Sequence, residues 1–159
     1  MSLLRIKIRE AKEDDLDQIG TLFYETVTAI NSRDYNPEQI KVWSQRETGF
    51  WNTRFKEQSF FVAEYNNQIV GFASITNSGY LDFMYIHKSH QRKGIARDLL
   101  HVIEQHCLLL ELSQIHTHAS ITARAFFENA GFVLMRGPQK QAKIGDVLFV
   151  NYAMKKELR

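Results

Sequence analysis

The chain has 159 residues, a length that favours a single domain around one buried core. Hydrophobic residues make up 44% of it and aromatic residues 12%, which excludes a disordered protein. The formal net charge is +2 and the sequence pI about 8.7. This is too weakly basic to indicate a nucleic-acid-binding protein, but it fits a protein that receives a polyanionic cofactor.

Cysteine usage and the N-terminus bear on the compartment. Cys107 is the single cysteine in the sequence, so no internal disulfide can form, which suits a reducing compartment. The first ten residues alternate charged and apolar side chains and lack the apolar core of a signal peptide. No apolar run approaches the roughly 20 residues that a membrane helix needs. We therefore expect a cytoplasmic protein without a membrane partner, present as a monomer or homodimer.

The N-terminal part predicts one strand and then helices. Residues 4–9 alternate apolar and basic side chains, which is typical of a strand with one buried face. Residues 12–30 have apolar side chains every three to four positions after an acidic start, which predicts an amphipathic helix. Pro37 is tolerated in a first helical turn and opens a second helix over 37–45. A further short helix is expected over 48–56.

The rest of the chain is dominated by strands. Three of them, joined first by an Asn-Asn pair that suits a hairpin turn, are expected over residues 59–65, 68–76 and 79–87. The remaining elements are a long helix, a short strand, a helix and two closing strands, over 94–112, 114–120, 122–130, 132–136 and 146–154. Neither a linker nor a repeat interrupts this order. It predicts one domain over residues 1–159, an α/β fold in which a mixed sheet carries helices on its faces.

Residues 91–97, Gln-Arg-Lys-Gly-Ile-Ala-Arg, stand between a predicted strand and the long predicted helix. A helix N-terminus exposes unpaired N–H groups and carries about half a positive charge, so a phosphate there gains charge-assisted hydrogen bonds. Gly94 lets the backbone approach a ligand closely, and Ala96 is nearly as small. Positive charge comes from Arg92, Lys93 and Arg97. The segment is neither a Walker loop nor a GxGxxG fingerprint, and the alternative interpretation is an ordinary basic helix cap.

The pattern Gln91-x-x-Gly94-x-Ala96 resembles the Q/R-x-x-G-x-G/A signature of the GNAT acetyltransferase superfamily, in which this loop grips the pyrophosphate of coenzyme A. Residues 120–132, SITARAFFENAGF, resemble the second GNAT motif, a short helix that ends in Gly-Phe beside the pantetheine arm. The order of elements matches the family over essentially the whole chain. The resemblance implies the acyl-CoA N-acyltransferase fold, with a mixed, mostly antiparallel sheet, and acetyl-CoA as cosubstrate.

The resemblance also implies a reaction: transfer of an acetyl group from acetyl-CoA directly to a primary amine of a small molecule or peptide. The family splays its sheet near the end of the third central strand, and there the backbone of Met84, Tyr85 and Ile86 would polarise the thioester carbonyl. A buried donor of this kind contributes about 3 kcal/mol. The loop and the second motif would supply the other cofactor contacts: Gln91, Arg92, Lys93, Gly94, Ile95, Ala96, Arg97, Ser120 and Phe127.

Asp82 is the candidate for the group that takes the amine proton. A lysine-like amine has a pKa near 10.4 and arrives protonated at neutral pH. A carboxylate inside the apolar strand YLDFMYI is costly to bury unpaired, so it has either a catalytic role or a local structural partner, and both interpretations stay open. By the two-residue period of a strand, Tyr80 and Met84 share its face, whereas Tyr85 points the other way.

Position 127 departs from the commoner GNAT pattern. Many members carry a tyrosine here that protonates the leaving thiolate, and Phe127 has no proton to give. Because a thiol has a pKa near 8.5, its thiolate is a tolerable leaving group, and Tyr152 or a water is the substitute acid. Phe127 also favours the alternative function, a non-catalytic protein that holds acyl-CoA as a sensor or interaction module.

The two helices after the first strand form the acceptor wall in this superfamily. Here they offer Glu25, Tyr35 and Trp43, which together with Tyr80 are the candidate substrate contacts. A carboxylate beside aromatic rings suits a small cationic amine. Trp51 is interpreted as core. The six histidines lack the spacing of a metal-binding motif and no cysteine cluster supports them, so we expect no metal site.

Overall fold

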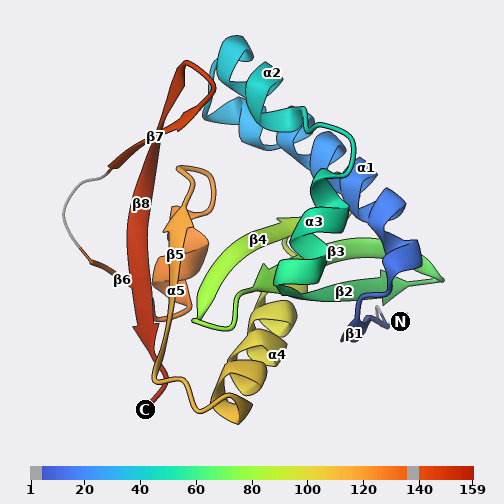
Figure 1. The fold of residues 1–159 in the computed structure, drawn as a ribbon, viewed down its shortest axis with the longest axis vertical. Helices are drawn as coiled ribbons and strands as arrows, with labels where there is room; N and C mark the ends of the chain where they lie inside the picture. Colours follow the sequence, from blue (N-terminus) through green and yellow to red (C-terminus); the bar gives the residue numbers. More distant parts are fainter. Residues whose placement is uncertain (1–4, 136–139) are drawn as a thin grey trace.

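The computed structural model describes residues 5–135 and 140–159, and within them one sheet organises the chain (Figure 1). Its strands are β1 (Lys7–Glu10), β2 (Ser59–Tyr65), β3 (Gln68–Ile75), β4 (Tyr80–Ile86), β5 (Gln114–Ala119), β6 (Val133–Leu134), β7 (Lys140–Ile144) and β8 (Val147–Glu157). Their order is β1-β2-β3-β4-β5-β8-β6, with β7 paired to β8. Among the paired strands of the described residues, β4–β5 is the one parallel pair. The predicted mixed, mostly antiparallel sheet is thus confirmed.

The helices begin and end close to where the sequence pattern places them. They are α1 (Leu16–Ala29), α2 (Pro37–Ser44), α3 (Phe50–Glu57), α4 (Ile95–Leu109) and α5 (Arg124–Asn129). The start of α2 shows why. The side chain of Asn36 accepts from the Gln39 N–H at 2.8 Å and the Gln39 side chain accepts from the Asn36 N–H at 2.9 Å, while Pro37 occupies the first turn. This reciprocal capping holds the helix at its predicted start.

Two apolar clusters cover the two faces of the sheet, which confirms the predicted helices on both faces. On one face α1, α2 and α3 pack a cluster rich in aromatic rings, centred on Phe23, Phe72 and Phe83. On the other face α4 and α5 pack a cluster that includes Leu99 and Phe127. Burial of these side chains removes apolar surface from water on both sides of the sheet, which stabilises the three-layer arrangement.

One strand of the structure is absent from the sequence-based prediction. Residues 140–144 form β7, a hairpin arm that pairs with β8 alone, and the turn between them places Gly145 at a φ of 60°. The segment Lys-Gln-Ala-Lys-Ile holds two apolar side chains, Ala142 and Ile144, so its polar–apolar alternation is a weak signal for a strand. The predicted strands over 4–9 and 132–136 also extend into residues 4 and 136, which lie outside the described part of the chain.

The β7–β8 hairpin reaches the helical layer at α2 (Figure 1). The Gln39 side chain donates to the carbonyl of Leu148 at 3.0 Å, and the Tyr35 hydroxyl donates to the carbonyl of Val150 at 3.2 Å. Phe149 places its ring 6.0 Å from that of Tyr35 and 5.9 Å from that of Trp43. These contacts join the hairpin to α2 and to the segment before it, and Tyr35, Trp43 and Phe149 also line a central cavity.

Candidate functional site

The site begins where β4 and β5 separate. Their parallel pairing is limited to two positions, Tyr80 with His116 and Leu81 with Thr117, and the Thr117 hydroxyl donates to the Leu81 carbonyl at 2.8 Å. Beyond Leu81 the two strands diverge (Figure 1). The edge of β4 from residue 82 to 86 is therefore not paired with β5, and its backbone groups are free to meet a ligand.

The carbonyl of Ile86 shows which way this edge faces. It accepts from Gln91 Nε2 at 2.6 Å and from Thr26 Oγ1 at 3.2 Å, so it points away from β3. Since backbone groups of a strand alternate in direction, the N–H and carbonyl of Met84 point to the same open edge. The splayed sheet expected near Met84 to Ile86 is confirmed. The Ile86 carbonyl, however, already accepts hydrogen bonds from two side chains.

The loop before α4 presents backbone donors to the same opening. Arg92 and Gly94 adopt the left-handed conformation, with φ of 59° and 82°, which turns the chain sharply into the helix. The first bond of α4 runs from the Asp98 N–H to the Gly94 carbonyl at 3.1 Å. The N–H groups of residues 95–97 precede it and have no acceptor within the helix. Three donors and the positive helix end thus face one spot, beside the guanidinium groups of Arg92 and Arg97.

These features open into one central cavity of about 1220 Å³. Eleven of the twelve residues predicted to bind the cofactor line this cavity, namely Met84, Tyr85, Ile86, Gln91, Arg92, Gly94, Ile95, Ala96, Arg97, Ser120 and Phe127. Lys93 is not among the lining residues. The Ser120 hydroxyl accepts from the Ala123 N–H at 3.1 Å and so orders the turn into α5.

The helical side of the cavity is aromatic. Its walls there are formed by side chains from α2, α3, β4, β8 and the segment before α2, namely Trp43, Phe50, Tyr85, Phe149 and Tyr35. Trp51 lies outside the lining and packs among Phe23, Phe72 and Phe83, as the core interpretation predicts. Burial raises the pKa of the Tyr85 hydroxyl, while a hydrogen bond from Trp43 and the charge of Arg46 oppose part of that rise. Tyr85 is therefore a neutral hydroxyl in the cavity at physiological pH.

Asp82 lines the cavity, but its neighbours differ from those predicted. The register of β3 against β4 shifts between Ser74 and Ile75, which makes Asp82 an extra, bulged residue. Met84 then packs in the cluster under α4, whereas the Asp82 carboxylate accepts from Gln58 Nε2 at 2.7 Å beside α3. The prediction that Asp82 and Met84 share a face is wrong, because a bulge breaks the two-residue alternation. Tyr85, predicted to point away, lines the cavity.

Besides Lys93, three predicted site residues lie outside the cavity lining. Glu25 lies on α1, where its carboxylate is 3.8 Å from Lys88 Nζ and 3.7 Å from the His87 ring nitrogen. Tyr80 packs against His116 and His118, its hydroxyl 3.2 Å from His118 Nδ1, and burial first and the Asp82 charge second raise its pKa to about 12. Neither Glu25 nor Tyr80 is therefore placed to contact a substrate in the cavity.

Tyr152 is the third. It lies on β8 opposite Ala119, and its ring is covered by the guanidinium of Arg124 at 4.3 Å. The ring contributes to the cluster under α4 and α5 rather than to the cavity wall. The structure thus does not bring the proposed substitute acid to the open edge of β4. Phe127 does line the cavity, with 4% of its surface exposed, and its ring packs 5.0 Å from that of Phe132.

Sequence reasoning missed several polar residues of the cavity. Arg46, Asn151 and His118 all line it, from the segment after α2, from β8 and from β5. Arg46 follows a predicted helix without any motif, and nothing in the neighbouring sequence marks it. An alternation on β8 could have indicated that Asn151 and Phe149 share one side. Their convergence depends on the β7–β8 hairpin, which the sequence did not reveal.

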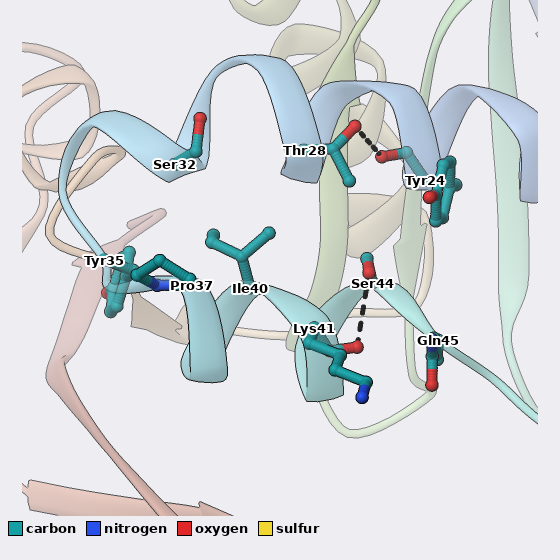
Figure 2. A pocket seen from close by; sticks show the side chains of 9 residues that line it. All are labelled: Tyr24, Thr28, Ser32, Tyr35, Pro37, Ile40, Lys41, Ser44 and Gln45. Carbon is teal, nitrogen blue, oxygen red and sulfur yellow. Dashed lines mark hydrogen bonds between the residues drawn. The ribbon is translucent and has the colours of Figure 1, made fainter.

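A second cavity, of about 390 Å³, lies between α1 and α2 (Figure 2). Its hydroxyl groups serve their own helices: Thr28 donates to the Tyr24 carbonyl at 2.8 Å and Ser44 to the Lys41 carbonyl at 3.3 Å. It meets neither the open edge of β4 nor the loop before α4. Within residues 5–135 and 140–159, no group of three or more metal-ligating side chains is found. In the same residues, no helix is both long and apolar enough to cross a membrane.

A sheet opened between two parallel strands, next to a glycine-bearing helix start, is the architecture of acetyltransferases of the GNAT class. The family model for the acetyltransferase (GNAT) domain matches residues 31–156. The chain is 31% identical over 150 residues to a protein of Escherichia coli (strain K12) named "Uncharacterized N-acetyltransferase YafP", covering 94% of this chain and 95% of that protein. The chain therefore belongs to the GNAT acetyltransferase family.

Solved structures agree with this assignment at the level of the fold. A GCN5-related N-acetyltransferase from Rhodopseudomonas palustris superposes with a TM-score of 0.92 at 20% identity, over 99% of each chain. The PaiA N-acetyltransferase from Thermoplasma acidophilum, solved in complex with coenzyme A, superposes with a TM-score of 0.77 at 18% identity, over 97% of this chain and 99% of that one.

Proposed function

We propose that this protein transfers an acetyl group from acetyl-CoA directly to a primary amine of a small molecule or peptide. One observation carries the proposal: the unpaired edge of β4 and the free N–H groups of α4 open into the same cavity as an aromatic wall with a carboxylate. A cofactor and an acceptor have room to meet there. Family membership supports the reaction class, and the coenzyme A bound in the Thermoplasma acidophilum structure supports the cosubstrate.

The phosphates of the cofactor belong at the start of α4. The N–H groups of residues 95–97 and the side chains of Arg92 and Arg97 supply donors and positive charge to a pyrophosphate. Gln91 has a different role, because its side-chain amide donates a hydrogen bond to the Ile86 carbonyl and so holds the loop against β4. The pantetheine arm then runs between the open edge of β4 and α5, where Ser120 and Phe127 line the opposite wall.

The transfer itself needs few groups. The amine nitrogen forms a bond to the acetyl carbonyl carbon, the carbon–sulfur bond breaks, and its electron pair leaves with the sulfur. The N–H of Met84, on the open edge of β4, is the donor placed to stabilise the charge that develops on the carbonyl oxygen. Asp82, in the same cavity, is the carboxylate that takes the proton from the attacking amine, directly or through a water.

Phe127 is the observation that favours a binding-only protein. It occupies the wall next to the cofactor arm and carries no proton donor, and its ring is buried among other aromatic rings. An acetyl transfer without a general acid is still chemically sound, because a thiolate takes its proton from water after leaving. The two functions therefore differ in turnover and not in cofactor binding.

The test separates binding from turnover. Calorimetry with coenzyme A measures the first, and release of free thiol from acetyl-CoA with a panel of amines measures the second. We expect coenzyme A to bind and thiol release to depend on the added amine. Binding without amine-dependent thiol release would establish the sensor function instead, and absence of coenzyme A binding would exclude both.

A further inference from the structure

We infer that Arg46 binds a carboxylate of the acceptor, so that the acceptor is an amino carboxylate with an apolar body. The inference rests on the proposed acetyl transfer and narrows its substrate class. Arg46 lies in the segment between α2 and α3 and lines the central cavity. Its guanidinium carbon is 5.1 Å from the ring centre of Phe23 and 5.1 Å from that of Phe50. Two rings and a bond from Nη1 to the Gln45 carbonyl at 3.1 Å hold the group in place.

The guanidinium of Arg46 lacks an acidic partner among the described residues. No carboxylate oxygen there lies within 4.0 Å of it, and its Nε is buried without a hydrogen-bond acceptor. The contrast is Arg9, which holds Asp15 at 2.8 Å and Glu64 at 3.2 Å. Burial lowers the pKa of Arg46, which reflects the cost of desolvating its charge. Nη1 donates to the Val42 and Gln45 carbonyls, at 3.5 and 3.1 Å, and Nε is buried, so Nη2 is the nitrogen left to donate to a carboxylate oxygen.

The carboxylates that line the cavity are those of Asp82 and Glu47, and neither forms an ion pair with Arg46. The negative charge of Asp82 raises the Arg46 pKa somewhat, yet its carboxylate is bound by Gln58 at 2.7 Å. The cavity therefore offers a negatively charged group, Asp82, and a positively charged group, Arg46, which face the same space from different elements. An ammonium next to Asp82 and a carboxylate next to Arg46 satisfy both groups with one small molecule. A polycation would instead meet Arg46 together with Arg33 and Arg54, the cavity arginines that are not assigned to the cofactor phosphates.

The body of the acceptor is set by the walls between these two groups. They are the rings of Trp43, Phe50, Tyr85 and Phe149. Rings that line a cavity favour an apolar or aromatic ligand, because its burial removes apolar surface from water. The expected class is therefore an amino acid with a hydrocarbon or aromatic side chain. This replaces the small cationic amine that Glu25 had suggested, since Glu25 lies outside the cavity.

The experiment compares amines that differ only in a carboxylate. L-Phenylalanine and 2-phenylethylamine form one pair, and L-leucine and 3-methylbutylamine form another. Each is assayed with acetyl-CoA against wild-type protein, Arg46→Gln, Arg46→Lys and Lys56→Gln. Lys56 is an exposed residue of α3 outside the cavity lining, so its substitution removes one positive charge without touching the site. Thermal melts establish that each variant is folded.

We expect the amino acid of a pair to have a kcat/KM at least about tenfold above that of its amine, since a charge-assisted hydrogen bond is strong. Arg46→Gln should remove that preference while leaving the affinity for coenzyme A unchanged, and Arg46→Lys should retain part of it. Lys56→Gln should keep the wild-type ratio. Amines acetylated as well as their amino acids, or a preference that survives Arg46→Gln in a folded protein, overturn the inference while acetyl transfer stands.

A binding measurement keeps the two proposals apart. The coenzyme A-loaded protein is titrated with L-phenylalanine by calorimetry, which needs no turnover. Binding that Arg46→Gln weakens about tenfold or more, without any thiol release, supports the carboxylate site and contradicts the transfer reaction. The inference is contradicted if L-phenylalanine does not bind and neither amino acid reacts, whatever other amine the protein acetylates.

Discussion

The amide of Gln91 donates to the carbonyl of Ile86 at 2.6 Å and so ties the loop before α4 to the end of β4. A second, longer bond runs from the same nitrogen to the His87 carbonyl at 3.4 Å. The glutamine of the loop motif thus holds the loop in register with the open strand edge. Gln91→Glu is the matched change, because a carboxylate of the same shape accepts only and faces two carbonyl oxygens.

The Gln91→Glu protein should bind coenzyme A about tenfold more weakly, since the loop loses a bond worth about 1 kcal/mol and gains repulsion. Calorimetry at constant salt measures this. Gln114→Glu, on β5 and outside the cavity lining, is the control for the added negative charge. An unchanged affinity in Gln91→Glu would show that the loop keeps its position without this brace.

Gly94 is the residue on which we expect the proposed phosphate binding to depend most. Its φ of 82° and the 2.8 Å that would separate an added Cβ from Arg97 Nη2 leave no room for a side chain without displacing Arg97. Gly94→Asp should abolish coenzyme A binding, because strain, bulk and negative charge all fall at the helix start that faces the phosphates. Calorimetry and a thermal melt give the two readouts.

Gly49 provides the control for strain. It has a φ of 85°, precedes α3, and an added Cβ there meets nothing within 4 Å. Gly49→Ala and Gly94→Ala should each cost about 1 kcal/mol of folding free energy. Gly94→Ala alone should weaken coenzyme A binding. Equal affinities in the two variants would mean that the loop does not hold the phosphates.

Asp82 is predicted to act as the base for the amine. Asp82→Asn should lower turnover about a hundredfold at pH 7 and by a smaller factor at pH 9, where more of a lysine-like amine is already neutral. Steady-state rates at the two pH values check this. Gln58→Ala removes the donor to Asp82 but keeps the carboxylate, so its loss should be smaller. A uniform loss in Asp82→Asn would instead mark a binding or structural carboxylate.

Substitution of Phe127 tests whether a general acid for the leaving thiolate is missing. Phe127→Tyr places a phenol at the cavity wall next to the cofactor arm and should raise kcat, up to the hundredfold that a general acid typically contributes where proton transfer limits the step. Phe132→Tyr puts the same hydroxyl on a buried ring outside the cavity lining and should destabilise the fold without raising kcat. A Phe127→Tyr protein with wild-type rates would show that solvent already protonates the thiolate fast enough.

Asp15 gives the fold its clearest acid dependence. Its buried carboxylate receives both guanidinium nitrogens of Arg9, at 2.8 and 3.1 Å, and the Lys12 N–H at 2.7 Å. These bonds, Arg9 first, lower the Asp15 pKa below its usual value of 3.8. A carboxyl whose folded pKa is depressed stabilises the fold above its unfolded pKa, and the contribution is lost as pH falls through the folded pKa.

Asp15→Asn should therefore lower the free energy of unfolding by about 2 kcal/mol at pH 7, because it leaves Arg9 without its bidentate partner. The difference from wild type should shrink as the pH is lowered below 4. Urea unfolding at several pH values measures both. Asp14→Asn, at the exposed neighbouring position, should have little effect at either pH. A difference that is the same at pH 3 and pH 7 would contradict the assigned role of the charge.

Sequence alone was sufficient for the parts of this protein that are written in contiguous residues. The spacing of apolar side chains placed α1 and α4, and Gln91-x-x-Gly94-x-Ala96 marked the start of α4, because a helix face and a tight loop are local in the chain. The order of these elements then indicated the fold. The sequence also interpreted Trp51 correctly as a core residue.

Tertiary structure decided the chemistry of the acceptor side. Strand alternation assigned Asp82 to the face of Met84, but one extra residue against β3 turned it toward Gln58, and such a bulge is defined only by the partner strand. Glu25 was expected in the site and lies outside it, whereas Arg46 was not expected and lies within it. A side chain's place in a cavity depends on contacts between segments far apart in sequence, and no spacing within one segment encodes them.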